Sequence, residues 1–465
     1  MKKNLFIISL MMMLWSCSKN AQLVPDQTKT SPGKLTAHAA GDQAWDVLGF
    51  GYDVTGEYGN SVSTTFPIID VAKLYAADPT RVVKNVSTSR NSTFSYGDNV
   101  QHYSSDLSAH LNATVGFSLF KASITSAYSD VSSFNSKYIY GSYNLLLQQR
   151  ELKFNAPTVI LQQYLTSNFK TDIGILTPEQ LVRQYGAFFL TDIMLGAKLQ
   201  ITYRSQTSSS DRKTAASAGL DQSLGSLFSI NAGINSQHSQ SSSNFNQYVH
   251  YVTHGGDPTV GITPNTIVFD QNTPPIDFGA WQSTTNAQNA VLIDIPSSGL
   301  IGIYDLIADP VKSKAVKDYI NNVFLPGNQV QAVFDKAPLY RCFSTANQDY
   351  MILTNPSEVS NLPSWKVEGV LGNVYTDNTK GGLVPVLRWY QYQAGYHFFT
   401  CNVNEIPSQA NQEGTQGYIN PTQVPGSKPL YRYRNSRGAH CYSVDVNELG
   451  PKNGWTLDGI MGYIE

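Results

Sequence analysis

The chain has 465 residues, of which 41% are hydrophobic and 14% are charged. Its length predicts two or three domains, and its apolar content is enough for a sizeable core. The net charge of −2 supplies no basic field, which argues against nucleic acid as a partner. The charged share lies below the usual value of about 25%, and abundant uncharged polar residues and tyrosines are typical of secreted or cell-surface proteins.

Residues 1–17 have the pattern of an export signal. Lys2 and Lys3 precede an apolar run, Leu5 to Trp15, which is too short to span a membrane as a mature helix. The run ends in Leu14-Trp15-Ser16-Cys17, which resembles the bacterial lipobox, where the cysteine becomes a lipidated N-terminus; an ordinary secretory signal with a chance cysteine is the alternative. Residues 18–40 read as a polar tether. We therefore expect an outer-membrane lipoprotein that is exposed at the cell surface or shed.

Residues 41–330 are expected to form one domain of mixed strands and helices. A strand and turn are predicted within 46–58. The Thr177-Pro178-Glu179-Gln180 segment predicts a helix start with a capping box. A second helix is predicted near the end of the domain from the spacing of five residues: Val311, Ala315, Tyr319, Ile320 and Val323.

Two segments in Ser/Asn-rich regions alternate apolar with small polar residues. Residues 107–120 and 222–237 around them contain no charged residue, although Lys121, Asp130 and 211–213 lie beside them. The apolar positions are Leu111, Ala113, Val115, Phe117 and Leu119 in the first segment, and Phe228, Ile230, Ala232 and Ile234 in the second.

This alternation has two interpretations. The first is a half-buried strand in a soluble sheet. The second is a latent membrane hairpin, because a spanning strand needs about 9–11 residues with an apolar lipid face and a polar lumen face. A barrel must close in lipid, and one chain with two hairpins cannot close it. The hairpin interpretation therefore implies a chain that is a monomer in solution and a homo-oligomer when active.

Residues 335–465 contain an internal repeat of three copies. They open at Pro338-Leu339-Tyr340-Arg341, Pro385-Val386-Leu387-Arg388 and Pro429-Leu430-Tyr431-Arg432. Asp349, His397 and His440 are taken as equivalent positions. Three short-stranded copies favour a closed, all-β threefold unit, and the repeat resembles a bacterial β-trefoil module.

An aromatic cluster marks the second copy: Trp389, Tyr390, Tyr392 and Tyr396. Sugars stack on such rings, so these residues are candidates for binding a glycan; filling of the domain core is the alternative. Without Cys17 the chain has three cysteines, Cys342, Cys401 and Cys441, so at least one thiol stays free. The spacing of Cys and His predicts no metal site, and no cofactor is expected.

Tyr185-Gly186-Ala187-Phe188-Phe189 with Leu195-Gly196-Ala197 resembles the signature of the membrane attack complex/perforin family. Tyr185, Gly186, Phe189 and Gly196 fit it; Ala187, Phe188 and Ala197 stand where the family has Thr, His and a second Gly. Residues 48–53 resemble the family's first conserved strand. Gly255-Gly256, within 254–258, resembles its Gly-Gly element, a hinge candidate that can also be a plain turn.

The resemblance implies an α+β fold, with a bent four-stranded antiparallel sheet flanked by helical clusters. In pore-forming members these clusters unwind into two hairpins, and neighbouring subunits complete a barrel. The two alternating segments fall where the family keeps its membrane-inserting segments. Some members do not form pores, so the resemblance alone does not establish lysis.

Three functions follow as hypotheses. The first is a pore-forming toxin or antibacterial effector whose partners are a target membrane and a surface glycan or protein receptor. The second is a non-lytic surface adhesion lipoprotein that uses the first domain as a scaffold. The third is an enzyme; the scattered histidines and the lack of a catalytic motif argue against it.

Overall fold

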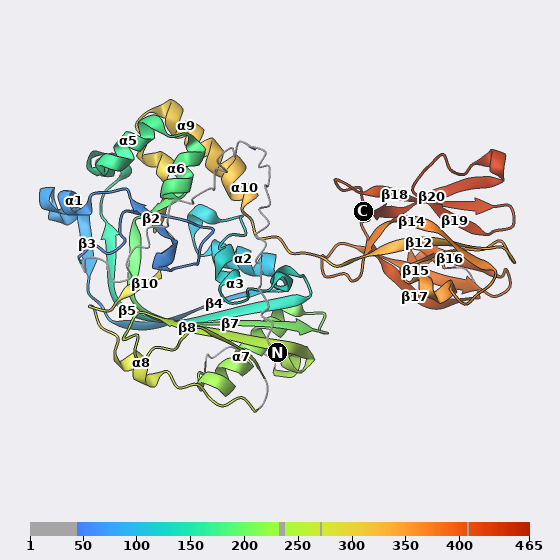
Figure 1. The fold of residues 1–465 in the computed structure, drawn as a ribbon, viewed down its shortest axis with the longest axis horizontal. Coiled ribbons are helices and arrows are strands. Elements are labelled where there is room, and N and C mark those ends of the chain that lie inside the picture. The colour runs from blue at the N-terminus through green and yellow to red at the C-terminus, as the bar shows by residue number, and fades with distance from the viewer. Residues whose placement is uncertain (1–43, 232–237, 270–271, 407–408) are drawn as a thin grey trace, which may run out of the picture. The chain divides into compact units, whose positions relative to one another are not determined.

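The computed structural model (Figure 1) describes residues 44–231, 238–269, 272–406 and 409–465. The predicted signal, Cys17 as the predicted lipidation site and the predicted tether lie outside the described residues, as do Ala232 and Ile234. Within the described part of the chain, no helix is long and apolar enough to cross a membrane.

Four long antiparallel strands form the centre of the first domain. They lie in the order β4 (Ser89–Gly97), β5 (Tyr138–Phe154), β7 (Asp192–Thr207) and β8 (Asn244–His254). Shorter strands extend this sheet: β3 (Val82–Asn85) beside β5, β10 (Val291–Asp294) beside β7, and β9 (Asn265–Val268) outside β8. Figure 1 shows that β5 and β7 bend along their length, so the predicted bent four-stranded sheet is confirmed.

A small sheet and a group of helices pack beyond the bend. The sheet has the order β11 (Leu300–Gly302), β6 (Phe188–Leu190), β1 (Phe50–Tyr52) and β2 (Thr64–Pro67). The helices are α1 (Val71–Ala77), α4 (Thr158–Leu161), α5 (Ser167–Ile175), α6 (Pro178–Tyr185), α9 (Pro310–Tyr319) and α10 (Leu325–Gly327). The predicted capping box is present, with the Thr177 hydroxyl accepting from the Gln180 N–H and the Gln180 side chain accepting from the Thr177 N–H.

The predicted helix near residue 311 exists, but its buried face differs from the expected one. Val311 is 78% exposed and Val323 is 56% exposed. Val316, Ile320 and Leu325 are buried, and of these only Ile320 belongs to the predicted set. The prediction assumed one regular helix. A π-helical turn, Ile320–Phe324, follows α9 and rotates the later residues relative to a regular helix, so apolar spacing alone did not identify the buried face.

Two helical clusters lie on opposite faces of the central sheet (Figure 1). The first cluster, residues 98–137, joins β4 to β5 and contains α2 (Val100–Ala109) and α3 (Lys121–Thr125). The second cluster lies in the connection from β7 to β8, of which residues 208–231 and 238–243 are described, and contains α7 (Arg212–Phe228). Tyr140 packs with the first cluster, whereas Tyr143 and Leu145 pack with α7. Successive side chains of a strand point to opposite faces, so the sheet separates the two clusters.

In residues 336–406 and 409–465 the repeat domain has nine strands, three from each copy, with the first strand of each copy in the middle. The strands are β12 (Lys336–Ser344), β13 (Tyr350–Leu353) and β14 (Trp365–Tyr375); β15 (Val384–Gln391), β16 (Tyr396–Thr400) and β17 (Ala410–Ile419); and β18 (Lys428–Asn435), β19 (His440–Ser443) and β20 (Trp455–Ile464). All three copies contribute to one core, in which Ile352, Phe399 and Tyr442 are fully buried. The all-β threefold repeat is confirmed, and its assignment to the β-trefoil fold stays a prediction.

Backbone register corrects one equivalence between the copies. Phe343 pairs with Tyr350, Tyr390 with His397, and Arg434 with His440. Tyr350, not Asp349, therefore corresponds to the two histidines. The copies differ in length, so spacing along the sequence placed the equivalent position of the first copy one residue too early.

Candidate functional site

The first candidate insertion segment is not a strand in this structure. Asn112–Thr114 form a 3-10 turn, and Gly116 takes a φ of +91°. Leu111 and Leu119 are fully buried against the sheet, Ala113 and Phe117 are half-buried, and Val115 is 57% exposed. The interpretation of this segment as a half-buried strand in the soluble sheet is therefore wrong. Its apolar residues are buried by turns and helices instead of by strand pairing.

The second candidate segment begins at the end of α7. Phe228 is the last residue of this helix, and Ser229 ends it with a left-handed φ of +52°. The Ile230 N–H then donates to the Leu224 carbonyl at 3.1 Å, and both Phe228 and Ile230 are buried against the sheet. In the soluble form Phe228 therefore belongs to a helix, and Ile230 lies just beyond its end.

The four signature residues are buried where α6 meets the two sheets. The Tyr185 hydroxyl donates to Asp172 at 2.7 Å, and its ring packs on Phe169 with centroids 4.8 Å apart. Gly186 ends α6 with a φ of +75°, and a Cβ there would lie 2.3 Å from the Tyr52 carbonyl oxygen. Phe189 is in the middle of the small sheet, paired with Gly51 and Ile301. The signature thus fixes how the helix and the small sheet join the long strands.

The structure brings the signature glycine and the hinge candidates together. A Cβ on Gly196 would lie 2.0 Å from the Leu147 carbonyl oxygen on β5, and a Cβ on Gly255 would lie 2.5 Å from the Gly196 carbonyl oxygen. Gly255 and Gly256 both take positive φ values, +70° and +71°, at the turn that ends β8. The Trp281 indole donates to the Gly255 carbonyl at 2.8 Å. The glycine pair is thus a turn, and it lies against β7 where a side chain would force the strands apart.

A buried ionisable cluster lies beside these glycines, and the sequence reasoning did not single it out. Lys198 is 2% exposed, and its ammonium donates to the carbonyls of Gly59 and Tyr58, at 2.8 and 3.3 Å. The Tyr58 hydroxyl donates to Asp294 at 2.9 Å. Burial lowers the pKa of Lys198 to about 8 and raises the pKa of Asp294. A lysine two residues after the signature glycine, within the otherwise uncharged and mostly apolar run 193–199, was the available signal.

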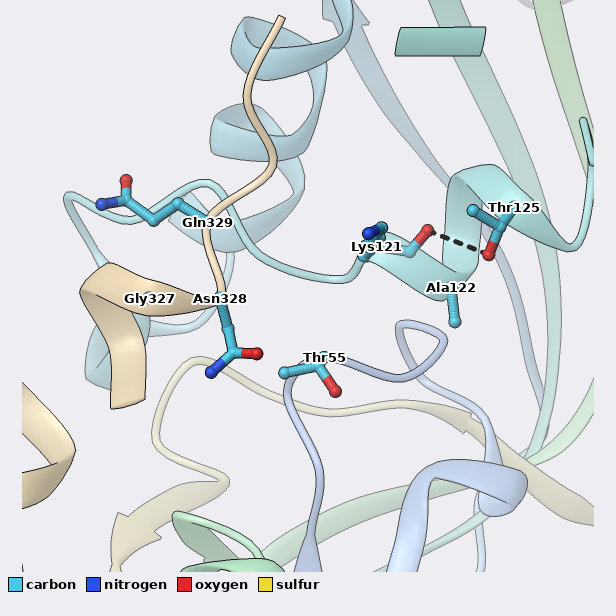
Figure 2. A pocket seen from close by; sticks show the side chains of 7 residues that line it. All are labelled: Thr55, Lys121, Ala122, Thr125, Gly327, Asn328 and Gln329. Atoms are coloured by element: carbon cyan, nitrogen blue, oxygen red, sulfur yellow. Dashed lines mark hydrogen bonds between the residues drawn. The ribbon is translucent and has the colours of Figure 1, made fainter. Parts of the chain in front are cut away.

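The loop that this cluster holds also contacts the first helical cluster. The Phe120 and Ala122 N–H groups donate to the Val54 and Thr55 carbonyls at 2.9 and 3.1 Å. The Tyr58 N–H donates to the Ser123 hydroxyl at 2.9 Å. A cavity of about 280 Å³ lies at this junction. Figure 2 shows the residues that line it: Thr55, Lys121, Ala122, Thr125, Gly327, Asn328 and Gln329. The first cluster therefore docks on the 53–59 loop and on the segment after α10, where the Val330 N–H donates to the Ser118 carbonyl.

Only part of the predicted aromatic cluster in the repeat domain is brought together. The rings of Tyr390 and Tyr392 have centroids 5.2 Å apart, and Tyr392 is 63% exposed. Trp389 takes the register position that buried Cys342 and Tyr433 occupy in the other copies, so the core interpretation suits it better. Tyr396 is half-buried at the start of β16.

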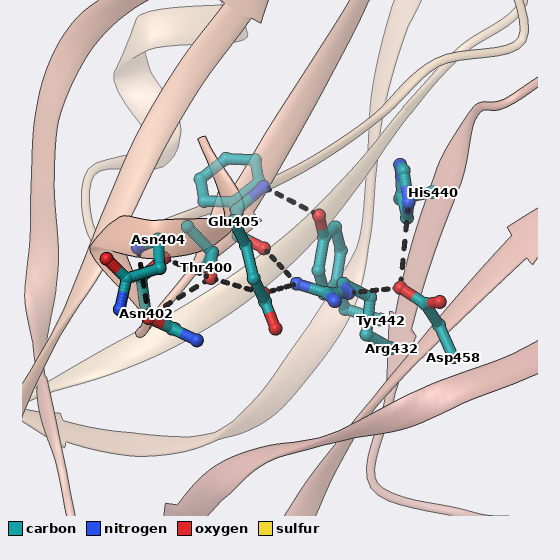
Figure 3. Close-up of polar contacts among 9 residues, drawn as sticks. Thr400, Asn402, Asn404, Glu405, Arg432, His440, Tyr442 and Asp458 are labelled. Carbon is teal, nitrogen blue, oxygen red and sulfur yellow. Dashed lines mark hydrogen bonds and ion pairs between the residues drawn. The ribbon is translucent and has the colours of Figure 1, made fainter. Parts of the chain in front are cut away.

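Three arginines join the copies into a closed ring. Arg388 contacts Glu413 of its own copy and Glu358 of the first copy, at 3.1 and 2.7 Å. Arg432 contacts Asp458 of its own copy and Glu405 of the second, at 2.7 and 2.9 Å (Figure 3). Arg341 contacts Glu368 of its own copy and Glu448 of the third copy, both at 2.6 Å. Each arginine thus reaches the preceding copy, and the third copy closes onto the first. These charges hold the domain together.

Comparisons with known proteins agree with this fold. The MAC/Perforin domain model matches residues 37–326, and a domain of unknown function, DUF5648, matches residues 323–412 and 408–465. A search of curated proteins finds no match.

Two solved structures illustrate the similarity. A putative cell invasion protein with a MAC/Perforin domain from Bacteroides thetaiotaomicron is 18% identical, with a TM-score of 0.50 over 68% of this chain and 70% of its own. GNIP1Aa from Chromobacterium piscinae is 16% identical, with a TM-score of 0.50 over 85% of this chain and 86% of its own. At these identities the likeness shows the fold alone. The family model, in contrast, matches more than half of the residues, and the chain belongs to the MAC/Perforin domain family.

Proposed function

We propose that this chain is a pore-forming toxin or antibacterial effector that oligomerises on a target membrane and inserts two hairpins per subunit. The repeat domain recognises the target surface through a glycan or protein receptor. The chain is not an enzyme, and it is an outer-membrane lipoprotein anchored through Cys17.

One geometric observation carries the proposal. The two helical clusters begin and end at the same end of the central sheet, because Gly97 pairs with Tyr140, Tyr138 with Gln206, and Thr207 with Asn244. Each cluster has 36 or more residues, from 98 to 137 and from 208 to 243. Each arm of a spanning hairpin needs about 9–11 residues. Unwound, both clusters have the length to extend β4, β5, β7 and β8 in one direction as two spanning hairpins.

The sheet edges support oligomerisation. Among the described residues, the outer edge of β4 pairs with no strand, and β9 covers only Tyr248–Tyr251 on the outer edge of β8. An uncovered edge is a template for pairing with another chain. Pairing of β4 of one copy with β8 of the next would propagate the sheet and lead to the closed barrel that a membrane requires.

A reversible covalent lock tests the release of the first cluster. Thr55 and Ala122 are joined by a backbone hydrogen bond and line the same cavity (Figure 2). A Thr55→Cys/Ala122→Cys chain would be oxidised and added to dye-loaded liposomes made from bacterial outer-membrane lipids. We expect dye release only after reduction, because the disulfide holds the cluster on the loop. The parent chain under both redox conditions is the control, since its Cys342, Cys401 and Cys441 form no disulfide.

The outcomes separate the two functional hypotheses. Equal release by the oxidised and reduced variant would show that the first cluster does not leave its site. A parent that releases no dye from any of several lipid mixtures or target cells would favour the non-lytic adhesion function, in which the first domain serves as a scaffold.

A further inference from the structure

The repeat domain carries the same three-ring arrangement at two of its three junctions. At the first junction, Phe343 and Tyr350 of the first copy lie with centroids 4.7 Å apart, and Trp455 of the third copy stands 5.9 Å from Tyr350. At the second junction, Tyr390 and His397 of the second copy are 4.9 Å apart, and Trp365 of the first copy stands 5.9 Å from His397. The tryptophan rings are inclined at 78° and 75° to their neighbours.

Strand register shows that these rings occupy equivalent positions. Trp365 pairs with Ser344, and Trp455 pairs with Asn435; the equivalent position in the second copy is Ala410, opposite Gln391. Arg434 stands where the other copies have Phe343 and Tyr390. The third junction therefore lacks both the tryptophan and the first ring of the pair. Two triads are present: Phe343/Tyr350/Trp455 and Tyr390/His397/Trp365.

The third strands extend the same difference onto the surface. Val367 and Val370 follow Trp365 and are 47% and 54% exposed. Leu457 and Ile460 follow Trp455 at the equivalent positions and are 47% and 50% exposed. The second copy has Gln412 and Thr415 there. Copies one and three thus both present a half-buried tryptophan with exposed aliphatic neighbours, and the second copy does not.

Polar and charged groups beside the rings narrow the class of ligand. Glu413 lies 3.3 Å from His397 and also contacts Arg388. Arg341 and Arg388 each contact two carboxylates, so neither guanidinium is free to attract an anion. The rings of both triads are half-buried. Aromatic rings suit the apolar C–H face of a pyranose, and nearby carboxylates can accept hydrogen bonds from its hydroxyls. Lys366, opposite Phe343, and Arg434, opposite Thr456 and thus next to Trp455, are exposed cations beside the first triad.

We propose that the two aromatic triads are paired binding sites for a neutral saccharide, and that the third junction does not bind. This inference rests on the proposed recognition role of the repeat domain. Two sites on one domain bind a repetitive polysaccharide with avidity, so the loss of one site lowers the apparent affinity by much more than half.

The test uses the full chain and biolayer interferometry on immobilised mannan, galactomannan and dextran, with heparin as the anionic probe. The parent is expected to bind at least one neutral polysaccharide. Trp365→Ala and Trp455→Ala should each weaken binding by about 100-fold or more through lost avidity, and the double variant should not bind. Trp365→Phe, which keeps a ring, should restore part of the affinity. Trp45→Ala, which removes a tryptophan from the first domain, should bind like the parent.

A gain-of-site variant completes the design. Ala410→Trp with Arg434→Tyr gives the third junction the missing rings and should strengthen binding to the same polysaccharide. Binding of the double tryptophan variant at the parental level would overturn the proposal, as would retention on heparin alone or on none of the neutral polysaccharides. Dye release from saccharide-free liposomes, measured on the same proteins, is independent of these results, so a failed triad and a failed pore can be told apart.

Discussion

Val115 and Asn112 provide a matched pair for testing insertion. Both side chains are exposed in the soluble form, so a lysine at either position should change the free energy of unfolding by no more than about 0.5 kcal/mol. In the proposed hairpin the two positions differ in parity, which places Val115 on the lipid face and Asn112 on the lumen face. Val115→Lys should therefore block insertion and Asn112→Lys should not.

The size of the effect follows from the depth of the residue. A lysine on the lipid face of a membrane barrel costs about 2–4 kcal/mol at the midplane and less near the interfaces. For one subunit this corresponds to roughly a 30- to 1,000-fold loss in the equilibrium for insertion, and an oligomer multiplies the cost by the number of subunits. Lumen-facing lysines remain in water and carry almost no such cost.

The assay is dye release from liposomes at matched protein concentration, with thermal unfolding as the check on folding. We expect unchanged unfolding for both variants, parental release for Asn112→Lys and abolished release for Val115→Lys. Equal release by the two variants would refute the assignment of residues 111–119 to a membrane strand. So would the reverse order.

Three further predictions follow from the fold and the sequence. Burial lowers the pKa of His250 to about 4, so the native state favours the neutral imidazole. The free energy of unfolding should then fall by about 2 kcal/mol as the pH drops from 6.5 to about 4. Urea unfolding of His250→Gln should show a shallower decline with pH, and a decline equal to that of the parent would contradict this. Gly255→Ala should lower the free energy of unfolding by about 2 kcal/mol or more, because the φ of Gly255 is +70° and a Cβ there would meet the Gly196 carbonyl. Gly225→Ala, where a Cβ would have no atom within 4 Å, should raise it by about 0.5–1 kcal/mol in the same denaturation series. Equal effects of the two variants would count against the close contact at Gly255. Cys17→Ser should abolish incorporation of labelled palmitate in cells and move the protein from the membrane fraction to the soluble fraction; persistent labelling would exclude the lipobox.

Features that depend only on neighbouring residues, or that repeat along the chain, were predicted from the sequence. The capping box at Thr177 acts within one helical turn, and the three arginine-bearing copies repeat openly in the sequence, so both were found without coordinates. The conformation of residues 111–119 was not predictable from alternation. Leu111 and Leu119 can be buried by a strand or by turns, and only packing against the distant 53–59 loop and the sheet decides between them.

The buried cluster escaped prediction for a related reason. Lys198 is satisfied by carbonyls from residues 58 and 59, more than 130 positions earlier, and it lies near Asp294 from a third segment. No spacing rule connects these residues. The two triads were also hidden, because each combines rings from two copies of the repeat, and only the packing of the copies brings Trp365 against His397.

The arginine ring makes the repeat domain circular in its contacts although its chain is linear. The two ends of the domain meet, because Lys336 forms an ion pair with the Glu465 side chain. The Asn373 N–H of the first copy also donates to the Glu465 carbonyl. In such a ring of contacts no copy is structurally first or last. A circular permutant that joins 465 to 336 through a short linker and opens between β14 and β15 would keep all three arginine contacts. A peptide of one copy, whose arginine and acidic partner face different neighbours, is by the same geometry a building block for a trimer.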